Sequence, residues 1–206
     1  MTYTQIKPLS FEKFLEEYPE DGKLYELVDG ELVEIRPIGA HQNVVRFIAK
    51  SFDREVDRLD LDYVVEQTAA IKTVTKDGWE QGRNPDVSLI DGAVWDANLS
   101  DYAALREPIQ LAVEVVSTNW RDDYLDKLDE YERLGIREYW IVDYRAIASM
   151  KYIGSPKVPT ISVYLLENGQ YQCSQFKGED LVISATFPEL KLTVDAIVAA
   201  SLPRQR

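Results

Sequence analysis

The stretch IQLAVEVV at residues 109–116 decides the fold class of this chain. It is a nearly continuous apolar run, which is typical of a central strand buried on both faces of a sheet. One carboxylate, Glu114, interrupts the run. Because burial of an unpaired carboxylate is costly in free energy, Glu114 must be neutral, paired with a cation or bound to a metal.

A second carboxylate begins the strand predicted just before this run. The sequence DVSLI follows the Asn84-Pro85 corner and predicts a strand that starts at Asp86. Neighbouring strands lie about 4.8 Å apart, so Asp86 and Glu114 could hold one divalent cation, with the backbone carbonyl of Val115 completing the ligand set. For Asp86 alone, a local turn closed by its side chain at the corner is the alternative.

The segment after the central strand predicts a helix that carries a lysine. Residues 121–134 have apolar side chains at helical spacing and end at Gly135. Lys127 lies one turn from Asp123 on the face that we expect to turn inward. A lysine directed at two carboxylates can neutralise charge, orient a water and stabilise a phosphoryl transition state. The alternative is a buried structural ion pair of Glu114 with Lys127 and no metal.

The remaining patterns predict the elements around this centre. They are a helix at 11–18, a hairpin at 24–35 around Asp29-Gly30, an amphipathic helix at 41–59, a strand at 63–74, a loop at 77–85, a strand at 138–143 and a hairpin at 161–176. In chain order the centre reads αβββαβ. This order predicts an α/β fold, or α+β by a stricter definition, with a mixed sheet flanked by helices and a β-hairpin toward each end.

Length and composition predict one domain over residues 1–206. Its core spans about residues 24–143, residues 1–23 form a helical arm, and residues 160–195 form a C-terminal hairpin and tail. The chain has no apolar run of membrane-spanning length and no signal-peptide pattern, so we expect a cytoplasmic protein without membrane contact. A single cysteine, Cys173, and a single histidine exclude an internal disulfide and a Cys/His zinc site. Any metal must therefore be held by oxygen ligands.

The charge of the chain is unfavourable for coating a nucleic acid. With 36 acidic and 23 basic residues the net charge is −13, which repels a polyanion at long range. Bound divalent cations would reverse the local field at the carboxylates that hold them. Four basic side chains recur every fourth residue in the helix at 41–59, namely Arg46, Lys50, Arg54 and Arg58. They could follow a phosphate backbone, but Asp53 and Asp57 interleave with them, and we expect a charge-paired surface.

Five fragments occur together in a recognisable order. They are YELVDGELVE at 25–34, NPD at 84–86, VEVVS at 113–117, D-x-x-x-K-x-x-x-Y at 123–131 and GIREYWIVD at 135–143. In this order and spacing the chain resembles the Uma-type restriction endonucleases of the PD-(D/E)XK nuclease superfamily. The resemblance covers about residues 25–143 and continues weakly into the C-terminal hairpin.

The resemblance implies a restriction-endonuclease-like core with a Mg²⁺ or Mn²⁺ site at Asp86 and Glu114. The activity that it implies is hydrolysis of a DNA phosphodiester by a metal-activated water. The superfamily usually has a lysine two residues after the glutamate, and here that position is Val116. Lys127 would then be the replacement, moved onto the following helix.

The same resemblance implies two accessory residues and leaves other functions open. Glu26 matches an outer or second-metal ligand, and His41 matches a family position of unclear role. Two alternatives remain: a catalytically inactive protein that keeps the fold for binding or as a scaffold, and a hydrolase of small phosphodiesters. A homodimer would supply two sites for a double-strand cut. No protein partner can be identified from the sequence.

Overall fold

The structure is a computed structural model that describes residues 8–99 and 104–203. Its helices are α1 (Phe11–Glu16), α2 (Gly39–Leu59), α3 (Gly92–Ala97), the π-helical segment η1 (Asp122–Asp126) continuing into α4 (Lys127–Leu134), α5 (Met150–Ile153) and α6 (Val194–Ala200). Its strands are β1 (Leu24–Val28), β2 (Glu31–Ile35), β3 (Tyr63–Glu66), β4 (Ala70–Val74), β5 (Glu80–Arg83), β6 (Val87–Asp91), β7 (Ala104–Leu105), β8 (Leu111–Val115), β9 (Glu138–Asp143), β10 (Thr160–Glu167) and β11 (Gln170–Lys177). Residues 1–7 of the predicted arm lie outside the described residues.

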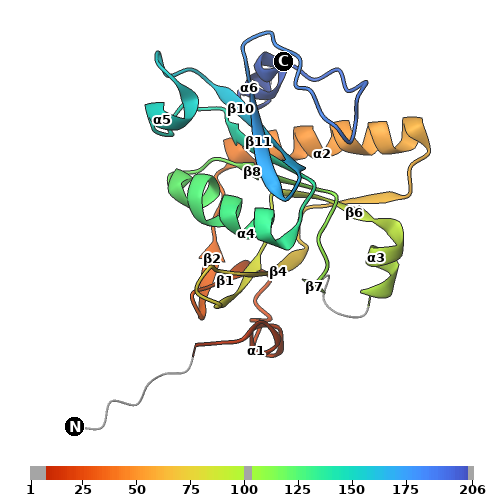
Figure 1. The fold of residues 1–206 in the computed structure, drawn as a ribbon, viewed down its shortest axis with the longest axis vertical. Coiled ribbons are helices and arrows are strands. Elements are labelled where there is room, and N and C mark those ends of the chain that lie inside the picture. The colour runs from red at the N-terminus through yellow and green to blue at the C-terminus, as the bar shows by residue number, and fades with distance from the viewer. Residues whose placement is uncertain (1–7, 100–103, 204–206) are drawn as a thin grey trace.

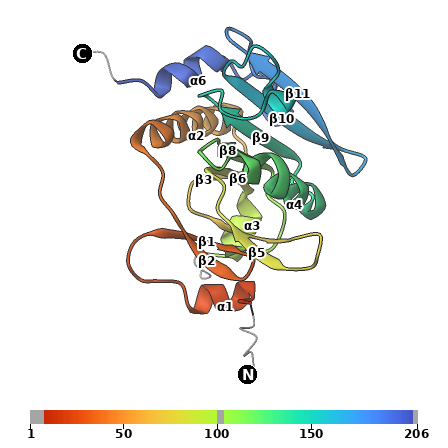
Figure 2. The same cartoon turned by 90° about the vertical axis from the view of Figure 1, so that its left-hand side faces the viewer.

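A six-stranded sheet forms the centre of the molecule, in the order β11-β10-β9-β8-β6-β3. β8 and β9 run parallel and are joined through η1 and α4, whereas the other neighbouring strands are antiparallel. Helices α2 and α4 lie on opposite sides of this sheet (Figures 1 and 2). The predicted mixed α/β fold is confirmed, with the αβββαβ order formed by α2, β3, β6, β8, α4 and β9.

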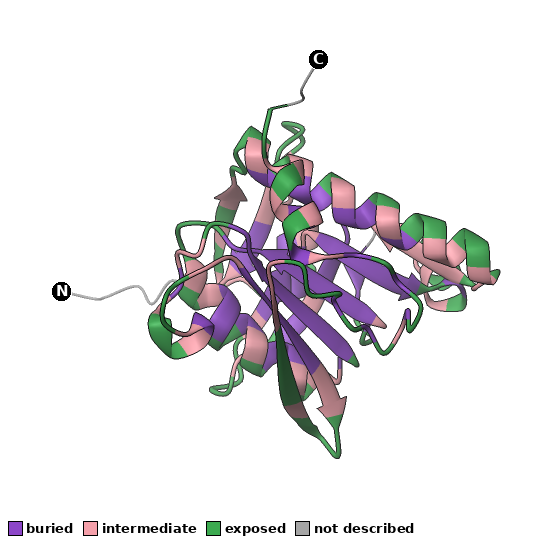
Figure 3. Ribbon diagram, turned by 90° about the horizontal axis from the view of Figure 1, so that it is seen from above, coloured by how far each residue is buried: buried purple, intermediate pink, exposed green. Residues whose placement is uncertain are grey.

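The alternation of side chains along β8 decides which layer each one meets. Val113 belongs to the apolar cluster formed with α2, whereas Ala112 and Val116 belong to the cluster formed with η1 and α4. Successive side chains of a strand point to opposite faces. Glu114 therefore lies on the sheet face covered by the helix that carries Lys127. Figure 3 shows that these central strands are the buried part of the molecule.

A second, five-stranded sheet lies beside the first, in the order β2-β1-β5-β4-β7. The turn between β1 and β2 has positive φ at both central residues, 50° at Asp29 and 82° at Gly30, as predicted for a primed turn. Gln81 of β5 exchanges two hydrogen bonds with Asp29, at 2.8 and 3.0 Å. Helix α1 packs on this sheet (Figure 1), and Gly82 leaves room for the ring of Phe14, which a Cβ atom would meet at 3.0 Å.

Two sequence-based predictions about strands are wrong. The single strand predicted at 63–74 is two strands, β3 and β4, that belong to different sheets. Between them the Glu66 carboxylate accepts hydrogen bonds from the backbone N–H groups of Gln67 and Thr68, which bends the chain. The loop predicted at 77–85 contains strand β5. Its sequence EQGR has no apolar alternation, because Gln81 and Arg83 are buried through polar contacts rather than apolar packing.

The predicted charge pairing along α2 is also largely wrong. Arg58 pairs with Glu55 at 2.7 Å and with Glu189 at 3.0 Å, not with Asp53 or Asp57. Arg46, Lys50 and Arg54 are exposed and form no ion pair with any residue that the structure describes. The described helices include none that is both long and apolar enough to span a membrane.

Candidate active site

Asp86 is held in place by a neighbouring strand rather than by a local turn. Asp86 directly precedes β6, which runs antiparallel to β8 with Val87 paired to Val113. Extending this register by one residue sets Asp86 opposite Glu114. Its Oδ2 atom accepts a hydrogen bond from the backbone N–H of Val115 at 2.7 Å. Its side chain remains 21% exposed, which leaves it open to solvent and to a ligand.

Glu114 lies deeper, beneath Asp86, and both of its oxygens have partners. Tyr131 donates its hydroxyl hydrogen to Oε1 at 2.8 Å, and the Lys127 ammonium lies 3.1 Å from Oε2. The residue is only 3% exposed. Burial raises the pKa of Glu114 well above its usual range, Lys127 opposes that shift, and the nearby charges of Asp86 and Asp123 add to it.

Lys127 is the cation at the centre of three carboxylates. Its Nζ lies 3.1 Å from Glu114, 3.3 Å from Glu26 and 3.9 Å from Asp123. Burial alone would lower the pKa of Lys127, but the surrounding carboxylates, led by Glu114, raise it well above its usual value. The lysine therefore stays charged. It begins α4 directly after the π-helical segment, a local irregularity that is frequent at functional sites.

His41, near the start of α2, connects to the same place from the other side of the sheet. Its Nε2 lies 2.8 Å from the carbonyl oxygen of Val115 and 3.2 Å from Oδ2 of Asp86. Both neighbours are acceptors, so Nε2 carries a hydrogen and donates it. Burial lowers the pKa of His41, but Asp86, the hydrogen bond to the Val115 carbonyl and the charge of Asp123 together raise it above its usual value.

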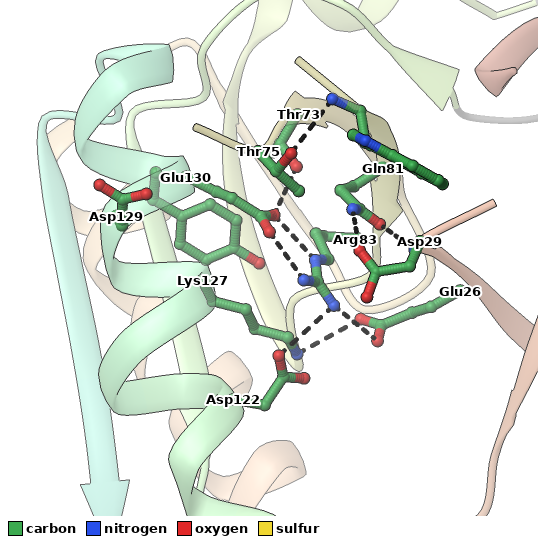
Figure 4. Close-up of polar contacts among 12 residues, drawn as sticks. Glu26, Asp29, Thr73, Thr75, Gln81, Arg83, Asp122, Lys127, Asp129 and Glu130 are labelled. Carbon is green, nitrogen blue, oxygen red and sulfur yellow. Dashed lines mark hydrogen bonds and ion pairs between the residues drawn. The ribbon is translucent and has the colours of Figure 1, made fainter. Parts of the chain in front are cut away.

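Arg83 links Glu26 to a second buried carboxylate (Figure 4). Its guanidinium donates two hydrogen bonds to Glu130, both at 2.8 Å, and its Nη1 lies 3.8 Å from Glu26 and 3.5 Å from Asp122. Glu26 also accepts from the backbone N–H of Asn84 at 3.0 Å. Arg83 is 2% exposed, so the series of contacts from Glu130 through Arg83 and Glu26 to Lys127 lies in the interior of the protein.

A cleft of about 600 Å³ opens onto these residues. Its lining includes the end of β2 and the segment that follows it to Ile38, together with residues 117–119 and Arg145. The residues predicted from the sequence all line it: Glu26, His41, Asp86, Glu114, Val115 and Lys127. The tertiary structure thus brings together every predicted site residue.

Comparisons with known proteins give the family of the chain and a similar fold. A family model described as "Putative restriction endonuclease" matches residues 11–195 of this 206-residue chain. The chain belongs to the Uma2 family. The fold of this Uma2 chain is similar to the crystal structure of "a putative nuclease belonging to DUF820" from Anabaena variabilis, with 16% identity, a TM-score of 0.70, and coverage of 95% of this chain and 100% of that chain. No curated protein matches the chain.

The donors in this Uma2 cleft suit a hard divalent cation. Two carboxylates and a backbone carbonyl are the oxygen ligands that Mg²⁺ prefers. Oδ2 of Asp86 and the carbonyl oxygen of Val115 lie 3.2 and 2.8 Å from Nε2 of His41, so these two oxygens approach the same side chain at the cleft. Among the described residues, no group of three or more His, Cys, Asp or Glu side chains is arranged to hold a metal ion, so a metal here would need other donors such as the Val115 carbonyl and water.

Three members of the Uma2 site were not predicted from the sequence. Asp123 and Tyr131 contact Lys127 and Glu114, and the D-x-x-x-K-x-x-x-Y spacing, which sets all three on one helix face, was the available signal. Tyr131 is also a fully buried member of the apolar cluster beneath α4. Arg83 lay in a segment predicted as a loop, and no sequence signal pointed to its burial.

Proposed function

We propose that this protein is a metal-dependent endonuclease that hydrolyses DNA phosphodiester bonds. The observation that carries the proposal is the convergence of Asp86, Glu114 and Lys127 on one cleft, two carboxylates beside a buried cation. The family description as "Putative restriction endonuclease" supports DNA as the substrate. Val116, at the position of the superfamily's usual lysine, is 1% exposed among apolar residues, which supports Lys127 as its replacement.

In this proposal Asp86, Glu114 and the Val115 carbonyl hold one Mg²⁺ or Mn²⁺ ion. The bound ion would polarise a phosphoryl oxygen and make a water molecule more acidic. The excess of negative charge in the site supports a cation there: burial and the neighbouring carboxylates, Asp86 and Asp123 among them, raise the pKa of Glu114 despite Lys127. A divalent cation would relieve that repulsion and favour the ionised carboxylate.

The protein's own cations have separate roles in this reaction. The Lys127 ammonium is held charged at the base of the cleft, where it stabilises negative charge that develops on the phosphoryl group. His41 donates to Asp86 and to the Val115 carbonyl, which orients both groups. The oxygen of a water molecule bonds to phosphorus as the bond to the leaving oxygen breaks; the water loses a proton to solvent, and the leaving oxygen takes up a proton from solvent to become a hydroxyl group.

The test is cleavage of supercoiled plasmid with Mg²⁺ or Mn²⁺. Wild type, Glu114→Gln and Glu189→Gln would be purified in parallel, since Glu189 is an exposed carboxylate far from the cleft in the sequence and outside its lining. Nicking by wild type and Glu189→Gln but not by Glu114→Gln would support the proposal. Equal cleavage by all three proteins would contradict it, because the activity would then come from elsewhere.

One observation favours a second candidate, a catalytically inactive binding or scaffold protein. Both oxygens of Glu114 already have partners in Tyr131 and Lys127, so the pair is satisfied without a metal. DNA or protein binding that is indifferent to Mg²⁺, together with no Mn²⁺ binding by calorimetry, would favour this candidate over the nuclease.

A further inference from the structure

A ridge of exposed residues runs along α2 from the mouth of the cleft. Ile38, which precedes the helix and lines the cleft, is followed at every fourth position by Gln42, Arg46, Lys50 and Arg54. All five are exposed. Side chains four apart on a helix form a continuous ridge, and each step advances about 6 Å along the axis.

The three cations of this ridge are unusual in so acidic a protein. Arg46, Lys50 and Arg54 have no ion pair with any residue in the described ranges, although the chain has 36 acidic residues. The next position of the ridge, Arg58, is neutralised by Glu55 and Glu189. The unpaired positive charge therefore occupies the part of α2 nearer the cleft and ends at Arg58.

A hollow flanks the same part of the ridge. It has a volume of about 430 Å³ and is lined by Arg46 and Lys50 together with Phe47 and the end of α6. Helix α6 lies beside α2 in both views (Figures 1 and 2). The two cations complement the phosphates of a nucleic-acid backbone, and the apolar floor beside them can contact its sugars.

We propose that the ridge of Arg46, Lys50 and Arg54 binds the phosphate backbone of a DNA substrate beyond the cleft. This inference rests on the proposed function, because the bound DNA would run from the cleft past Ile38 and along α2. Spacing of about 6 Å between successive cations allows neighbouring phosphates of one strand to be contacted in turn. The contacts reach only phosphates, so they add affinity without sequence preference, and they supply the local attraction that a net charge of −13 lacks.

The test is direct binding of a short fluorescein-labelled DNA duplex in the absence of divalent metal, measured by anisotropy over a range of salt concentrations. The double variant Arg46→Gln/Lys50→Gln is compared with Arg58→Gln, a matched removal of a cation from the same helix that is already paired. We expect the double variant to bind at least about tenfold more weakly at low salt. Its log–log salt slope should fall by about 1.8, because two phosphates are no longer neutralised by the protein, while Arg58→Gln behaves as wild type.

Each other outcome overturns the inference. Equal affinity of the double variant and wild type, an equal weakening in Arg58→Gln, or no DNA binding by wild type at low salt would show that this ridge is not the binding track. The outcome is separable from the proposed function. If the double variant loses DNA binding and wild type does not cleave plasmid, the ridge binds DNA but the proposed nuclease activity is wrong. If cleavage depends on Glu114 and the double variant binds DNA as wild type does, the nuclease proposal stands and the inference about the ridge is wrong.

Discussion

The ammonium nitrogen of Lys127 lies 3.1 Å from Oε2 of Glu114, and the two residues are only 6% and 3% exposed. Strand β8 supplies the carboxylate, and the helix that crosses over it supplies the cation. Two charges withdrawn from water depend on each other, because neither could remain ionised there alone.

Replacing Lys127 with methionine should therefore destabilise the protein strongly. The variant would leave Glu26, Glu114 and Asp123 without their shared cation, and we expect the free energy of unfolding to fall by about 3–5 kcal/mol. Urea unfolding measures this decrease. Lys191→Met, at an exposed position, is the control and should change stability by less than about 0.5 kcal/mol. A similar small effect at Lys127 would mean that the carboxylates are not charged together.

Asp123 should make stability depend on pH. Burial raises the pKa of Asp123 from the usual 3.8 to about 7, although Lys127 lowers it. Between these two values the folded protein holds a proton that the unfolded chain has released, so stability decreases as pH rises from about 4 to about 7 and is not regained above that. The slope for one proton is about 1.4 kcal/mol per pH unit.

The substitution Asp123→Asn removes the titrating carboxyl group, so the stability of the variant should depend less on pH between about 4 and 7. Urea unfolding of both proteins at several values of pH gives the difference between them, in which distant titrating groups cancel and the effect of the Asp123 charge on Glu114 is included. Parallel curves for wild type and Asp123→Asn would show that the carboxyl group titrates at its ordinary pKa.

The substitution Arg83→Lys should lower the stability of the folded protein far more than the same substitution at an exposed arginine. Lysine cannot reproduce the paired hydrogen bonds to Glu130, and it leaves that buried carboxylate poorly satisfied, so we expect stability to fall by about 2–4 kcal/mol. The matched control is Arg133→Lys, because Arg133 pairs with Asp129 at the surface. This change should lower the free energy of unfolding by less than about 1 kcal/mol. Thermal unfolding of the two variants provides the measurement, and equal effects would refute a special role for the buried pair.

Magnesium should stabilise the folded wild-type protein. A ligand that binds only the folded state adds about 2.7 kcal/mol at a concentration of 100 times Kd, and the effect should disappear in Asp86→Asn, which retains the size of the side chain but loses its charge. Asp195→Asn, a change in the first turn of α6, should respond to Mg²⁺ as wild type does. A rise in Tm that persists in Asp86→Asn would place the ion elsewhere.

Much of the fold could be predicted because its patterns are local. The apolar run around Glu114, the helix ending at Gly135 and the hairpin at Asp29-Gly30 each have a physical signature within a few residues, and each is confirmed. Strand β5 could not be predicted, because Gln81 and Arg83 are buried only through partners far along the chain. The same holds for the division of residues 63–74 between two sheets.

The sequence by itself predicted that Asp86 begins one strand, that Glu114 lies inside the next and that Lys127 is on the inward face of the following helix, because strand alternation and helical spacing are properties of short segments. Only the tertiary structure decided how these charges are satisfied. Lys127 lies among three carboxylates, His41 donates to Asp86 and to the Val115 carbonyl, and Arg83 pairs with the buried Glu130. Only the tertiary structure decided, too, that Arg46 and Lys50 stay unpaired within the described part of the chain. Pairing of charges depends on distances between side chains from separate elements, and packing of the whole chain sets those distances.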